Sequence, residues 1–121
     1  MKSHVRPTVA YIAGRLIVGR NGTSVYDYGI GKYISIDGAV TANSVDIYDY
    51  SRRCALDGSG NGTQFDLYHY GDGHHVDLEI RGRNFEGYDY GNGAYFEGSV
   101  SGNDIELFDF ETGRTYNFSL S

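Results

Sequence analysis

An aromatic motif recurs along this chain at a nearly constant spacing. It reads Tyr26-Asp27-Tyr28, Tyr48-Asp49-Tyr50, Tyr68-His69-Tyr70, Tyr88-Asp89-Tyr90 and Phe108-Asp109-Phe110. The first interval is 22 residues and the next three are 20 residues each. A fixed period of this length indicates one supersecondary unit that is used repeatedly.

The repeated unit has the pattern of a β-hairpin. Glycine-rich turns such as Gly71-Asp72-Gly73 and Gly91-Asn92-Gly93 follow the motif, and turns such as Gly60-Asn61-Gly62 separate the units. Gly, Asn and Asp supply the positive φ angles that short hairpin loops need. The 121 residues, with 18 Gly and a single Pro, are therefore predicted to form one all-β domain spanning 1–121. It is an antiparallel meander of about five hairpins, with ten or eleven strands of about seven residues each.

Alternation along the strands assigns their faces and their register. If Asp49 lies opposite Cys54, then Ile47 meets Leu56, and the same register applied to the next hairpin pairs Leu67 with Val76. The aliphatic face is expected inside. A long meander leaves two unprotected edges, and closure removes them, so the chain is predicted to form an up-and-down barrel. The alternative is a curved open single sheet whose apolar face is covered by a partner.

The opposite face carries rows of tyrosines, which offer wide, rigid contact area to a sugar ring or a protein partner. The candidate ligand-binding residues are Tyr26, Tyr48, Tyr50, Tyr68, Tyr70, Tyr88 and Tyr90. The same register places acids opposite one another on this face, and like charges in such positions destabilise a sheet. These pairs are Asp46 with Asp57, Asp66 with Asp77, and Glu86 with Glu97. A basic partner, a calcium ion or solvent screening would offset the repulsion, although no calcium-loop motif is present.

The middle residues of the motif are expected at one rim of the barrel, where an Asp before a turn accepts hydrogen bonds from turn amides. Asp109 is also expected to form an ion pair with Arg114 across the last hairpin. His69 departs from the pattern: the register places it opposite His74, with Asp72 in the intervening loop. Two imidazoles and a carboxylate suggest a zinc site or a pH-sensitive pair.

Composition excludes several classes of protein. A net charge of −6 and a pI near 5.0, with no basic stripe, argue against binding to nucleic acid. The single Cys54 rules out an internal disulfide. The apolar stretch 9–18 contains Gly14 and Arg15, so it does not resemble a signal peptide, and no segment has the length of a transmembrane helix. We therefore expect a cytoplasmic protein that does not engage a membrane.

These features predict a non-enzymatic binding module for a small molecule, a glycan or a protein. Two surfaces are available: the tyrosine-rich outer face, and the barrel interior, which a small apolar molecule would occupy. The alternative is a structural protein that self-assembles into a homo-oligomer through its regular Tyr and acidic face. A metal-dependent site at His69, His74 and Asp72 comes third, with zinc or calcium as the only cofactors considered. No nucleophile-elbow or phosphate-binding motif indicates an enzyme.

Overall fold

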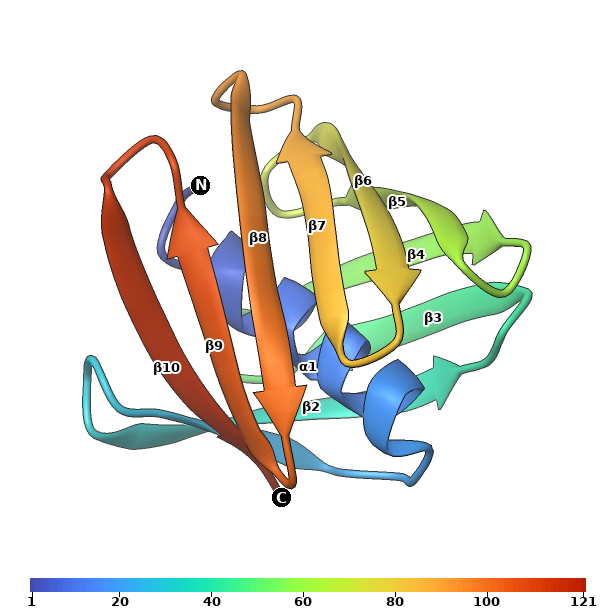
Figure 1. Ribbon diagram of the computed structural model, residues 1–121, viewed down its shortest axis with the longest axis horizontal. Coiled ribbons are helices and arrows are strands. Elements are labelled where there is room, and N and C mark those ends of the chain that lie inside the picture. Colours follow the sequence, from blue (N-terminus) through green and yellow to red (C-terminus); the bar gives the residue numbers. More distant parts are fainter.

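The computed structural model, which describes residues 1–121, is a closed barrel of ten antiparallel strands (Figure 1). Each strand pairs with its neighbours in the chain, and β1 closes the barrel against β10. The prediction of an up-and-down barrel is confirmed, and the open sheet is excluded. The strands are β1 (Ser24–Asp27), β2 (Lys32–Val40), β3 (Ser44–Asp49), β4 (Cys54–Gly60), β5 (Gln64–His69), β6 (His74–Arg81), β7 (Asn84–Asp89), β8 (Ala94–Ser101), β9 (Asp104–Asp109) and β10 (Arg114–Leu120).

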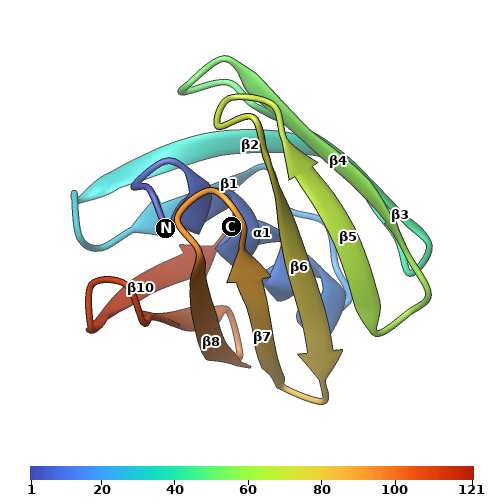
Figure 2. The ribbon, with the colours of Figure 1, turned by 90° about the horizontal axis from the view of Figure 1, so that it is seen from above.

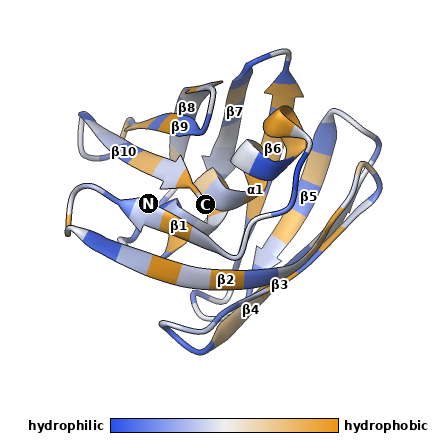
Figure 3. Cartoon of the chain, turned by 90° about the horizontal axis from the view of Figure 1, so that it is seen from below, coloured by the Kyte–Doolittle hydropathy of each residue, from blue (hydrophilic) through white to orange (hydrophobic).

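The predicted register and faces are also confirmed. Asp49 pairs with Cys54 and Ile47 with Leu56, and Leu67 pairs with Val76 in the next hairpin. Apolar and polar residues alternate along the strands, as the banding in Figure 3 shows. The inward side chains form the core and include Val45, Ile47, Leu56, Phe65, Leu67, Val76, Leu78, Phe85, Phe96, Ile105, Leu107 and Phe118, all no more than 3% exposed.

Glycines occupy inward positions where neighbouring strands come too close for a side chain. A Cβ atom at Gly87 would lie 1.9 Å from the Asp77 carbonyl oxygen, and one at Gly98 would lie 2.0 Å from that of Glu106. The rings of Phe96 and Phe85 lie against these glycines, 2.5 Å and 2.4 Å from the same Cβ positions. Glycine at such points lets a sheet bend sharply, and a neighbouring aromatic ring covers the exposed backbone.

An α-helix, α1 (Val5–Val18), runs through the inside of the barrel (Figures 1 and 2). The side chains of Val5, Val9, Ala10, Ile12 and Ala13 on this helix have no solvent exposure. A barrel of more than eight strands has a lumen wider than its own side chains fill, and here the helix fills it. The interior that the sequence left open for a small apolar ligand is thus occupied by the protein's own chain.

The sequence analysis did not predict α1, although its two ends carry helix signals. Pro7 lies in the first turn, where its missing N–H leaves no hydrogen bond unmade, and Gly19 ends the helix at φ 75° with its N–H donated to the Arg15 carbonyl. The helix is apolar on nearly all sides, as a fully enclosed helix must be, so it lacks the one-sided periodicity of a surface helix. The structure contains no helix with the length and apolar character needed to cross a membrane.

Polar contacts fix the C-terminal end of α1 within the barrel. The Arg15 guanidinium donates to the Gly38 carbonyl at 2.7 Å, to the Tyr11 hydroxyl at 2.9 Å and to the Asn21 side chain at 2.8 Å. The Tyr11 hydroxyl in turn donates to the Gly22 carbonyl. A cation at a helix C-terminus also interacts favourably with the helix dipole, so Arg15 is stabilised although it is only 8% exposed.

Candidate functional site

Every hairpin carries two aromatic rings of the motif in edge-to-face contact on the outer face of the barrel. In the pair Tyr88–Tyr90 the ring centroids are 4.8 Å apart, and in Tyr68–Tyr70 they are 4.9 Å apart. The first ring of each motif is about half-buried. The second ring is more exposed, and Tyr70 and Tyr90 each expose more than half of their surface. The predicted outward position of the tyrosines is confirmed, and part of their role is to stabilise the hairpins.

Three further rings join this surface from the opposite strands. Tyr33, His75 and Tyr95 pair across the hairpins with Tyr26, Tyr68 and Tyr88. Sequence reasoning missed them because it searched for the repeated motif, and these residues are not part of it. The register itself contains the signal, since placing Asp89 opposite Ala94 also places Tyr88 opposite Tyr95.

Second-ring tyrosines reach across to carboxylates of the preceding hairpin. The Tyr70 hydroxyl donates to Asp57 at 3.1 Å, and the Tyr90 hydroxyl donates to Asp77 at 2.8 Å. Each carboxylate accepts a hydrogen bond from the neutral phenol and repels the negative charge that ionisation would create, so it raises the pKa of its tyrosine. The two carboxylates are thereby held in place by neutral donors.

The predicted opposition of acids is present in the sheet. Asp46 pairs with Asp57, Asp66 with Asp77, and Glu86 with both Glu97 and Glu79. The basic side chains in contact with these acids are few. His75 lies 3.1 Å from Asp66, and Arg81 lies 3.1 Å from Glu79 and 3.3 Å from Glu86. The side chain of Arg81 is 67% exposed, so solvent screens its attraction to these carboxylates.

A groove with a volume of about 640 Å³ lies on the outer face of β5–β8. Its floor includes Phe65, Leu78 and Gly87, which lie side by side on β5, β6 and β7. Phe65 pairs with Leu78, and Leu78 pairs with Gly87. Its walls carry the edge-to-face pair Tyr88–Tyr95, with centroids 4.7 Å apart, and outward polar side chains. The carboxylates in the lining are Asp66, Asp77, Glu79 and Glu86. We refer to this hollow as the central groove.

The central groove brings together only part of the predicted site. Of the seven candidate tyrosines, Tyr88 lines it, and Tyr68 lines an adjoining hollow of about 550 Å³. The other five lie outside the central groove. Tyr95, Gln64 and Glu79 line it although the sequence did not single them out.

The histidine cluster lies at a rim of the barrel, away from this groove. His69 and His74 are paired as predicted, but His69 has no solvent exposure, whereas His74 is exposed. The His69 Nδ1 accepts the backbone N–H of Asp72 at 3.1 Å, and the Asp72 carboxylate pairs with Lys2 at 2.6 Å. No group of three or more His, Cys, Asp or Glu side chains has the arrangement of a metal site.

The other motif acids cap their turns at the same rim, as predicted. Asp27, Asp49, Asp89 and Asp109 accept backbone N–H groups two residues further on, at 2.8–3.0 Å. Burial raises the pKa of Asp89, and the hydrogen bond from Gly91 opposes this shift. One carboxylate oxygen of Asp49 and one of Asp89 are buried without a hydrogen-bond partner.

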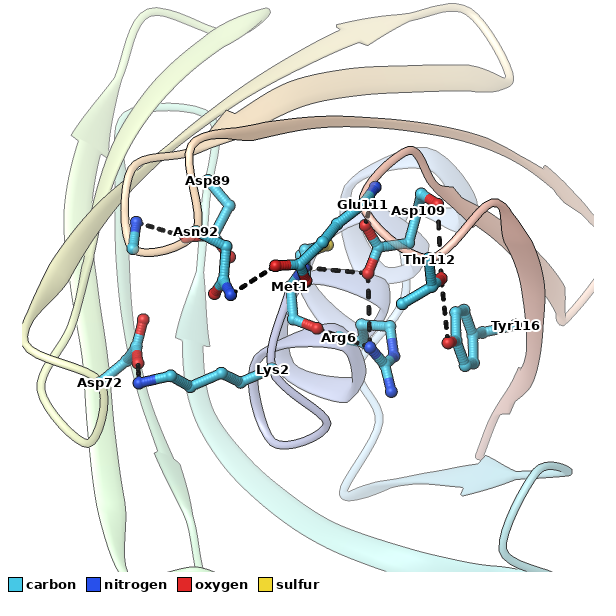
Figure 4. A network of polar contacts seen from close by, with 11 residues as sticks. Met1, Lys2, Arg6, Asp72, Asp89, Asn92, Asp109, Glu111, Thr112 and Tyr116 are labelled. Carbon is cyan, nitrogen blue, oxygen red and sulfur yellow. Dashed lines mark hydrogen bonds and ion pairs between the residues drawn. The ribbon is translucent and has the colours of Figure 1, made fainter.

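The predicted ion pair between Asp109 and Arg114 is wrong. Figure 4 shows that Asp109 faces the Met1 ammonium and the Arg6 guanidinium, at 2.9 Å and 3.3 Å. Met1 also contacts Glu111 at 2.7 Å. Asp109 points into the barrel and is fully buried, whereas Arg114 is exposed. Met1, which precedes α1, and Arg6 in its first turn supply the cations instead.

Replacing His69 with asparagine is expected to reduce the loss of stability on mild acidification. Burial, with the nearby imidazole of His4, lowers the pKa of His69, and Asp72 and Asp49 only partly oppose this. The unfolded chain therefore takes up a proton near pH 6.5 that the folded protein binds only at lower pH. Stability falls as pH drops below 6.5, by at most about 1.4 kcal/mol per pH unit from this group.

Urea unfolding of wild type and His69→Asn from pH 7.5 to pH 5 measures this difference. An asparagine oxygen retains an acceptor for the Asp72 N–H but does not titrate. His75→Asn, at an exposed position, is the control. Equal pH dependence in wild type and His69→Asn would contradict the assignment.

Comparison with protein-family models, with curated proteins and with solved structures returns no match in any of the three.

Proposed function

We propose that the protein is a non-enzymatic binding module that holds its ligand in the central groove. The observation that supports this most directly is the lining: two tyrosine rings and two opposed carboxylate pairs around one hollow of about 640 Å³. Small-ligand sites typically have volumes of about 300–1,000 Å³ with a few convergent polar groups. Tyrosine faces supply contact area at low entropic cost, and carboxylates accept hydrogen bonds from hydroxyl or amine groups.

Two further observations favour binding over the other functions considered. A carboxyl group that acts as a general acid near neutral pH needs a raised pKa, whereas Arg81 lowers the pKa of Glu79 and the groove's carboxylates are exposed or only half-buried. Self-assembly through this face would bring the acidic rows of two copies together, and such like-charge contacts cost several kcal/mol. A ligand that carries no acidic row of its own avoids that repulsion.

Tyr95→Ala is expected to weaken ligand binding about fivefold or more, because it removes the more exposed wall of the groove. Tyr95 is 66% exposed and pairs with Tyr88. The measurement is an NMR titration of the labelled protein with a panel of neutral oligosaccharides, basic peptides and acidic peptides. Chemical-shift changes should cluster on β5–β8.

Tyr33→Ala provides a closely matched control. Tyr33 is also 66% exposed and pairs edge-to-face with Tyr26 at 4.8 Å, but it lies outside the groove. Binding should be unchanged in this variant. If no member of the panel shifts residues of the groove, or if both variants bind equally, the proposed function is wrong.

A further inference from the structure

The central groove is the middle part of a longer acidic surface. A hollow of about 550 Å³ adjoins it over β3–β6 and shares Asp66 and Ser59 with it. A third, of about 500 Å³, adjoins it over β6–β10 and shares Glu86. The three hollows thus follow one another around the outside of the barrel. We refer to their carboxylates as the acidic track, which comprises Asp46, Asp57, Asp66, Asp77, Glu79, Glu86, Glu97 and Glu106.

The charge along this track lacks enough positive groups to balance it. Eight carboxylates line the three hollows, and only His75 and Arg81 among their lining residues are basic. Carboxylates directly opposite one another in a sheet repel and destabilise it. A bound polycation would relieve this repulsion, whereas a neutral ligand would leave it in place.

Aromatic rings are placed along the track where they can contact cations. Tyr68 lines the first hollow, Tyr88 and Tyr95 line the central groove, and Phe108 lines the third. An Arg or Lys side chain lying on such a face gains a cation–π interaction in addition to its contact with a carboxylate. Each hollow therefore combines a carboxylate and an aromatic ring, and both of these groups can bind a basic side chain.

The length of the track indicates a polymer rather than a single amine. From β3 to β9 there are six strand-to-strand steps, which at about 4.8 Å each span about 29 Å. An extended peptide covers this distance with about nine residues at about 3.3 Å per residue. Resting on the proposed function of the groove, we propose that the acidic track binds an extended Lys- and Arg-rich segment of a partner protein.

Fluorescence anisotropy with a labelled peptide of alternating arginine and glycine, about nine residues long, tests this proposal. The wild-type protein should bind the peptide, and binding should weaken as salt rises from about 0.05 M to about 0.3 M. A peptide with glutamine in place of arginine should not bind. The double variant Asp66→Asn with Asp77→Asn should raise the Kd about tenfold, as expected for two exposed ion pairs.

A charge-matched control separates the track from the overall charge of the protein. Asp37→Asn with Asp104→Asn changes the net charge equally, at exposed positions that line none of the three hollows, and should leave the Kd unchanged. Equal weakening in both double variants, or no binding of the arginine peptide, overturns the proposal. If a neutral oligosaccharide binds the groove while the arginine peptide does not, the proposed function stands and the basic partner is excluded.

Discussion

Gly98→Ala is expected to lower the free energy of unfolding by about 3 kcal/mol or more, at the upper end of the cost of overpacking a core. The added Cβ would lie 2.0 Å from the Glu106 carbonyl oxygen and 2.4 Å from the Phe85 ring. The Phe85 ring is held in a packed core, and the Glu106 carbonyl belongs to the β8–β9 ladder. Moving either of them to make room for the methyl group therefore costs stability. Urea unfolding followed by circular dichroism measures the change.

Gly113→Ala separates this close approach from backbone strain. Gly113 has φ 67°, and a Cβ there would meet nothing within 4 Å, so its variant should lose only the roughly 1–2 kcal/mol of a left-handed residue. Gly98 has no such φ. If the two variants lose equal stability, strand proximity does not explain the glycine at position 98.

The repeat predicts the sheet well because a strand pairing repeated at one period leaves little freedom. Once Asp49 is placed opposite Cys54, every later hairpin follows at the same offset, and a slip of one residue would turn Ile47 outward. The outward tyrosines and the opposed carboxylates follow from the same register. Tyr95 was within reach of this reasoning, since it lies opposite Tyr88.

The repeat could not predict the long-range contacts of the N-terminal segment, which comprises Met1 and the helix α1 that follows it. The Met1 ammonium contacts Asp109, 108 residues away, and nothing in the hairpin pattern indicates a cation there. The prediction of an ion pair between Asp109 and Arg114 considered only residues adjacent in the sheet. The segment before α1, which lies outside the repeat, supplies a buried partner in Met1.

The grooves depend on how the barrel bends, which alternation does not describe. The repeat places Gly87 and Gly98 on the inward face. It does not show that the neighbouring strand comes so close at these positions that a Cβ atom would collide with it. Where the strands bend, outward side chains on neighbouring strands diverge, and hollows such as the central groove form between them. Sequence thus predicts which residues face outward but not which of them enclose a hollow.

Ile12→Asp is expected to prevent formation of the folded barrel. Ile12 lies in the middle of α1 with no solvent exposure, and a carboxyl group there would find only the apolar core around it. A buried acid whose pKa rises by about four units costs about 5 kcal/mol, and the lost burial of isoleucine adds about 1.5–3 kcal/mol. Together these match the total stability of about 5–15 kcal/mol typical of a domain. Circular dichroism and amide NMR spectra should show loss of the native sheet.

Ile12→Leu, which conserves volume, should cost less than about 1.5 kcal/mol and retain the native spectrum. The comparison tests whether α1 is the core on which the strands assemble or an insert that a closed barrel tolerates losing. If the strands form a closed barrel without the helix, Ile12→Asp will expel α1 and leave native-like strand signals, with a lumen accessible to an apolar dye. We expect the other result, because the inward residues of ten strands cannot meet across a lumen wide enough for a helix. Their burial, which drives folding, therefore requires α1 in place.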